Sequence, residues 1–147
     1  MRATAPRWIT AGLAYPVRVR MTASQHEALV AHAREEAPNE CCGFVRARDG
    51  VVRDIVQAVN DRASPYGYSL DAKSLLSAFN AAEEGFEVGI YHSHPRSPAE
   101  PSQTDINLAD YPEYVYLIVS LADPDSPDVR AWRIADKRVS EEAIVVE

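Results

Sequence analysis

Apolar and polar residues alternate in several short runs along the chain, which is the period of a half-buried β-strand. Residues 17–21 alternate strictly, and residues 114–120 form the most strongly strand-like run. Asp136-Lys137 lies between two further apolar runs, so we predict a hairpin there. The runs that predict strands are 17–21, 41–47, 51–58, 88–94, 114–120, 129–134 and 139–146.

Capping residues predict where the helices begin and end. The hydroxyl of Thr22 can cap the first turn of a helix, Gln25 occupies the capping-box position, and Pro38 prevents continuation. Asp71 is an N-cap candidate for a second helix over residues 72–84. Two main helices therefore accompany the strands.

The order of these elements predicts the fold class. Ser102 starts a short third helix before Pro112, and residues 95–101 form a rigid exposed loop with three prolines. We expect an α/β fold in which a mixed, largely antiparallel β-sheet is sandwiched by the two main helices. A chain of 147 residues supports one core, so we assign residues 17–147 to one domain and interpret residues 1–16 as a flexible N-terminal leader.

Composition and charge narrow the classes of partner. The formal net charge is −7, from 15 Lys and Arg against 22 Asp and Glu, which argues against a groove that neutralises many phosphates, so we expect no nucleic-acid partner. No apolar run approaches the roughly 20 residues that span a bilayer, so we expect no membrane partner. The two cysteines, Cys41 and Cys42, are neighbours and form no disulfide framework, which favours a reducing, cytoplasmic setting. The oligomeric state is not indicated.

The pattern His92-Ser93-His94 predicts a metal site. Residues two apart on a strand point to one face about 6.6 Å apart, so the two imidazoles can hold one ion while Ser93 faces away. Asp105 follows on the first turn of the short helix and is the candidate third ligand. Two histidines and an aspartate leave one tetrahedral position open, as a catalytic Zn²⁺ requires.

Each motif taken alone has a simpler interpretation. A His-x-His pair can be two ordinary polar side chains, and Ser102-x-x-Asp105 can be only a capping-box variant. Cys41 and Cys42 are most simply small core residues, and a site with two cysteine ligands would leave Asp105 unexplained. The order and spacing of the histidine pair and the capping motif together favour the metal site.

A hydrolytic zinc site also needs a general base. Glu40 is the candidate, because it precedes a strand and follows Pro38, which places it at a sheet end. A glutamate at such a junction is otherwise usually solvated. Ser93 and Thr104 are interpreted as bystanders.

The combination of Glu40, His92-x-His94 and Ser102-x-x-Asp105 resembles the signature of the JAMM, or MPN-plus, zinc metalloproteases. The resemblance extends beyond the metal motif. The further matching segments are similar to those of the bacterial branch of the family. It implies the JAMM/MPN-like, cytidine-deaminase-like architecture. The further matching segments are Pro38-x-Glu40-x-Cys42-Gly43, Asn60 with Ser64-Pro65, Tyr68-x-Leu70-Asp71 and Ile90-Tyr91.

The resemblance implies a role for each matching residue. His92, His94 and Asp105 hold zinc, Glu40 is the acid and base, and Ser102 helps to stabilise the tetrahedral oxyanion. It also implies an activity: hydrolysis of an amide at the C-terminal Gly-Gly tail of a small β-grasp protein of the ubiquitin-like and sulfur-carrier class, with release of cysteine in cysteine biosynthesis. We expect the tail to add as a strand to a sheet edge.

Three alternatives remain open at this point. The first is a general isopeptidase that removes ubiquitin-like proteins from lysines. The second is a non-catalytic MPN scaffold, which the presence of all five polar positions disfavours. The third is a metal-free binding module for ubiquitin-like tails.

Overall fold

The computed structural model describes residues 18–147 and contains, within that range, seven strands and three helices. The proposed leader, residues 1–16, lies outside the described residues, so its assignment stays a prediction. In chain order the elements are β1 Arg18–Met21, α2 Ala23–Glu36, β2 Cys42–Arg48, β3 Val51–Ala58, α3 Ala72–Glu83, β4 Glu87–His94, α4 Gln103–Leu108, β5 Val115–Ser120, β6 Asp128–Ala135 and β7 Arg138–Val146.

The strands form one sheet that closes into a barrel in the order β1-β3-β2-β4-β5-β6-β7. The β2–β3, β2–β4, β5–β6 and β6–β7 pairs are antiparallel, whereas β4–β5, β1–β3 and β1–β7 are parallel. The predicted mixed, largely antiparallel sheet is therefore present. The predicted sandwich is corrected to a barrel, because β1 pairs with β7 and also meets β3 at Arg20 and Val51.

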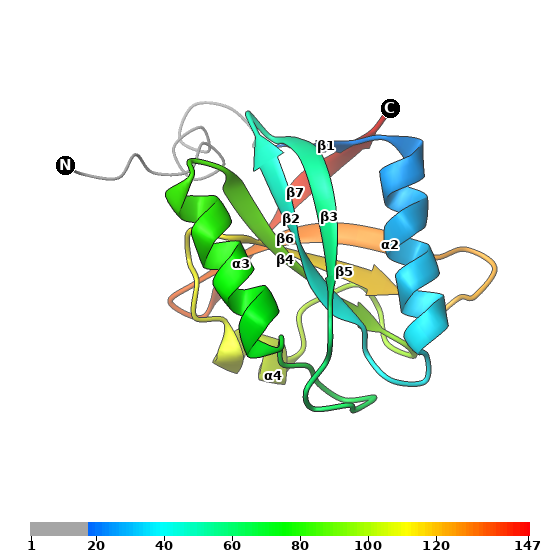
Figure 1. Ribbon diagram of the computed structural model, residues 1–147. Helices are drawn as coiled ribbons and strands as arrows, with labels where there is room; N and C mark the ends of the chain where they lie inside the picture. The colour runs from blue at the N-terminus through cyan, green and yellow to red at the C-terminus, as the bar shows by residue number, and fades with distance from the viewer. Residues whose placement is uncertain (1–17) are drawn as a thin grey trace.

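The two main helices still lie on opposite sides of the β2-β4-β5 part of the sheet (Figure 1). On the inner side, α2 buries Leu29, Val30 and Ala33 against side chains from the strands of the barrel. On the outer side, α3 buries Ala78 and Ala81 in a second cluster. In β2, β4 and β5 the alternation of the strand sends successive residues into one cluster or the other.

The predicted caps are present. Thr22 Oγ1 accepts from the Gln25 amide at 3.0 Å, and Gln25 Oε1 accepts from the Thr22 amide at 2.9 Å. The Asp71 carboxylate accepts from the backbone N–H of Ser74 at 3.1 Å. None of the helices among residues 18–147 is long and apolar enough to cross a membrane.

Strand β4 is buried along its whole length. It pairs with β2 on one side and β5 on the other, and the two clusters cover its faces. Its last residues, His92 and His94, are therefore only 1% and 4% exposed. Polar side chains this deep need partners, because an unpaired buried polar group costs free energy.

Candidate active site

The side chains of His92, His94 and Asp105 converge beyond the end of β4. The two Nε2 atoms lie 3.1 Å apart, and Asp105 Oδ2 lies 3.2 Å from His92 Nε2 and 3.0 Å from His94 Nε2. Ligands of a tetrahedral zinc ion at 2.0–2.1 Å are about 3.3 Å from one another. The three atoms are therefore spaced almost as zinc ligands are.

The loop between β4 and α4 brings Asp105 to the histidines. Ser120 Oγ donates to the Ser97 carbonyl at 2.6 Å, and Trp132 Nε1 donates to the Ala99 carbonyl at 2.8 Å. These bonds tie the proline-rich loop to β5 and β6, and Ala99 is buried although we expected an exposed loop. The loop is thereby held where α4 can begin beside β4.

The donor set fits a metal ion. His94 Nδ1 lies 2.7 Å from the Pro98 carbonyl, which can only accept, so Nδ1 carries the proton and Nε2 presents a lone pair to the cluster. Burial lowers the pKa of His92, which favours its neutral form. Burial tends to raise the pKa of Asp105, but its bonds to the histidines hold the pKa well below the usual range. Several lone pairs thus meet in a buried space, as zinc binding requires.

Glu40 lies at the same end of the sheet, because β2 runs antiparallel to β4 and Cys42 pairs with His92. It is only 5% exposed, so the alternative of a solvated glutamate is wrong. Its Oε1 atom has no hydrogen-bond partner among residues 18–147. Burial raises the pKa of Glu40 to about 7, and the nearby charge of His94 acts in the opposite direction. A carboxyl group with this pKa can both accept and release a proton near neutral pH.

Ser102 caps α4, as the spacing predicts. Its Oγ atom accepts from the Asp105 amide at 3.0 Å, while its own amide donates to Asp105 Oδ2 at 2.9 Å. Because Oγ serves the helix as an acceptor, its hydroxyl proton stays free to donate elsewhere. The capping and oxyanion roles are therefore compatible.

Ser93 is a positioning residue that the sequence analysis missed. Its Oγ atom accepts from the Cys41 amide at 2.8 Å, and its amide donates to the Cys41 carbonyl at 3.1 Å. These bonds fix the backbone next to Glu40. The alternation of β4 correctly predicted that Ser93 faces away from the metal side, but no local pattern indicated its partner Cys41, which precedes β2.

Tyr68 and Asn60 also organise the site. The Tyr68 ring stacks on His92 with centroids 4.2 Å apart. Asn60 Nδ2 donates to the carbonyls of Glu40 and Gly67 at 2.9 and 3.1 Å. Both residues lie in segments that carried the family resemblance, which was the only signal for them in the sequence.

The cysteines are buried core residues. Both thiols are free, and burial raises the pKa of Cys41 to about 11 and that of Cys42 to about 12. The protonated thiols do not act as thiolate ligands at neutral pH. The burial of both side chains agrees with the interpretation of Cys41 and Cys42 as small core residues.

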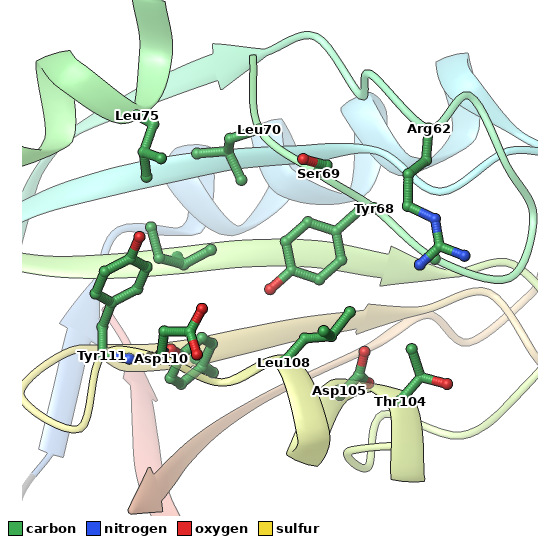
Figure 2. A pocket seen from close by; sticks show the side chains of 13 residues that line it. Arg62, Tyr68, Ser69, Leu70, Leu75, Thr104, Asp105, Leu108, Asp110 and Tyr111 are labelled. Atoms are coloured by element: carbon green, nitrogen blue, oxygen red, sulfur yellow. Dashed lines mark hydrogen bonds between the residues drawn. The ribbon is translucent and has the colours of Figure 1, made fainter. Parts of the chain in front are cut away.

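A cavity of about 470 Å³ adjoins the metal cluster. Figure 2 shows it running from Asp110 and Tyr111 at one end, past Tyr68, to Arg62 and Asp105 at the other. Thr104, which we had interpreted as a bystander, also lines it. Much of the lining is apolar or aromatic, and these side chains include Leu70, Leu75, Ile90, Leu108 and Tyr116.

The fold and the site define a class of protein. Residues 22–135 match the family described as prokaryotic homologs of the JAB domain, so the chain belongs to that family. It is a JAMM-type metallopeptidase, the class that the sequence motif indicated.

Several individual proteins are similar to the chain. The CysO-cysteine peptidase of Mycobacterium tuberculosis is 40% identical over 123 residues, covering 81% of this chain and 84% of the relative. The desampylase of Haloferax volcanii is 40% identical over 113 residues, covering 70% of this chain and 81% of the relative. A solution structure of a protein from Desulfitobacterium hafniense superposes with a TM-score of 0.77 at 37% identity, covering 87% of this chain and 92% of that one.

Proposed function

We propose that the protein hydrolyses the amide bond that follows the Gly-Gly tail of a small β-grasp protein of the ubiquitin-like and sulfur-carrier class, and that it releases cysteine. The observation that carries this proposal is the buried cluster of His92, His94 and Asp105 with Glu40 beside it, at the end of a cavity. The named relatives, a CysO-cysteine peptidase and a desampylase, support a substrate of this class. The buried free thiols of Cys41 and Cys42 agree with a cytoplasmic location.

His92, His94 and Asp105 would hold the zinc ion. When bound, zinc supplies a Lewis acid that polarises the substrate carbonyl and activates water. Glu40 accepts a proton from the attacking water and returns it to the leaving nitrogen. The free hydroxyl proton of Ser102 is donated to the oxyanion that develops on the carbonyl oxygen.

The cavity offers the tail a path to the site. Pairing of the tail with a sheet edge stays a prediction, because β1 meets β3 only at Arg20 and Val51 and most of that edge of β3 has no strand partner. In Figure 2 the Tyr68 and Leu108 side chains lie on facing sides of the cavity. An extended Gly-Gly segment has no side chains and advances about 3.3 Å per residue, so it can pass between such groups.

The comparison of two leaving groups tests this function. We expect kcat/KM for a β-grasp carrier ending in Gly-Gly-Cys to exceed that for the same carrier joined through Gly-Gly to a lysine side chain of a folded protein. The reason is that no long insertion that could grip a second folded protein interrupts the elements of residues 18–147. Mass spectrometry of the products measures both rates. A ratio below one would favour the isopeptidase alternative, which the desampylase relative represents.

A Ser102→Ala substitution should lower kcat by less than a Glu40→Gln substitution does, because a zinc ion held by His92, His94 and Asp105 would supply Lewis-acid stabilisation beside the Ser102 hydroxyl. It should also destabilise the protein by about 1 kcal/mol through loss of the α4 cap. The matched control is Thr22→Ala, which removes a capping hydroxyl from α2 on another part of the fold. An equal fall in kcat in both variants would show that Ser102 acts only through stability.

A further inference from the structure

Arg62 is the only lysine, arginine or histidine among the described residues that line the cavity. Figure 2 shows its guanidinium pointing toward the space beside Thr104 and Asp105. Within residues 18–147 this guanidinium makes no hydrogen bond and no ion pair. A cation without a partner, beside a cavity in an acidic protein, is available to an anionic group of a ligand.

The loop that carries Arg62 is held in place. The Arg62 amide donates to Asn60 Oδ1 at 3.1 Å, and the same asparagine donates to the Glu40 carbonyl. The Arg62 guanidinium lies against Gly67, so closely that a Cβ at position 67 would be 2.6 Å from Arg62 Cζ. Asn60 thus links the backbone of Arg62 to the segment that carries Glu40. The charge of Arg62 acts to lower the pKa of the Glu40 carboxyl.

The position of Arg62 along the cavity fixes which part of a substrate it meets. A tail that enters beside Asp110 and Tyr111 and follows the apolar middle reaches the metal cluster at Asp105. Arg62 lies at that same far end. The group that lies beyond the scissile bond, which is the residue to be released, therefore falls beside Arg62.

We propose that Arg62 binds the α-carboxylate of the released amino acid, an inference that rests on the proposed function. In an amide to a C-terminal residue, the carboxylate carbon is two bonds from the scissile nitrogen. In an isopeptide to a lysine side chain, no carboxylate lies near that nitrogen. Arg62 thereby selects carriers that bear a single C-terminal amino acid, because a guanidinium fork matches a carboxylate with two charge-assisted hydrogen bonds.

The reaction itself is an ordinary hydrolysis. The C–N bond breaks, the water hydroxyl joins the Gly carbonyl carbon, and the remaining proton joins the nitrogen of the leaving amino acid. Arg62 takes no part in these bond changes. It holds the carboxylate of the leaving amino acid before and during the cleavage.

The test compares two substrates that differ only at the carboxylate. A chemically synthesised β-grasp carrier ending in Gly-Gly-Cys is prepared with a free C-terminal acid and with a C-terminal carboxamide, and each is given to the zinc-loaded full chain. We expect kcat/KM for the acid to exceed that for the amide by roughly tenfold to a hundredfold. The Arg62→Gln variant should bring this ratio close to one. Because both substrates meet the same Glu40, a changed pKa of the base cancels in the ratio.

Two further variants show whether a change in the ratio of kcat/KM for the acid over the amide comes from the position of the Arg62 guanidinium or from any substitution of an arginine. Gly67→Ala keeps Arg62 but displaces its guanidinium, so the ratio should fall as it does in Arg62→Gln. Arg53→Gln removes an exposed arginine of β3 that lies outside the cavity and should keep the wild-type ratio. Thermal unfolding confirms that each variant is folded.

The outcomes are distinct. Cleavage of both substrates with equal kcat/KM by the wild-type chain, or an Arg62→Gln variant that keeps the preference for the acid, would overturn the assignment of Arg62 and leave the proposed function intact. Failure of the zinc-loaded wild-type chain to cleave either substrate would reject the proposed function, and the assignment of Arg62 with it.

Discussion

Replacement of Glu40 with glutamine is expected to lower kcat by about 10²–10⁴-fold, the usual contribution of a general acid and base. The amide has the shape of the carboxyl group but cannot accept a proton from water at neutral pH. Glu40 is buried, its Oε1 atom has no partner among residues 18–147, and its pKa is raised to about 7. Steady-state kinetics with a carrier ending in Gly-Gly-Cys measures the loss, and zinc analysis should still find one ion per chain.

Glu36→Gln is the matched control for this experiment. Glu36 lies at the end of α2 and is exposed, so its substitution should leave kcat unchanged. A Glu40→Gln variant with kcat within about threefold of wild type would show that the base is another residue. In that case a fall in kcat of the Glu36→Gln variant would identify Glu36 as the base.

Removal of a zinc ligand is expected to abolish activity together with metal binding. Under the proposed function three ligands would hold the ion, so His92→Ala or Asp105→Asn should reduce the zinc content well below one ion per chain. The asparagine variant keeps an oxygen for the Ser102 amide, so the cap of α4 survives. Metal analysis after dialysis measures the effect.

The fold should persist in these variants, because the two apolar clusters do not depend on the ion. Circular dichroism checks this expectation. His26→Ala is the control, since His26 lies on α2 outside the cluster. Full zinc occupancy in both ligand variants would reject the assignment of the metal site, and a chelator that left wild-type activity unchanged would reject zinc as the cofactor.

The sequence by itself determined the features that depend on neighbouring residues. Alternation in β4 placed His92 and His94 on one face, and the spacing of Ser102 and Asp105 predicted the capping box of α4. The period of a strand and the reach of a capping side chain involve only a few positions, so they can be read from a short stretch. The candidate ligands and the base followed from these local patterns and from the family resemblance.

Only the tertiary structure decided the properties that arise between distant segments. The barrel closes because β1 pairs with β7. The sequence of neither strand indicates which other strand it pairs with. The burial that raises the pKa of Glu40 comes from elements remote in sequence, and so does the bond between Ser93 and Cys41. The cavity that ends at Arg62 is lined by two loops, helices α3 and α4, and strands β4 and β5. Desolvation and cavity shape depend on which segments pack together, and that is fixed by the whole core rather than by any local spacing.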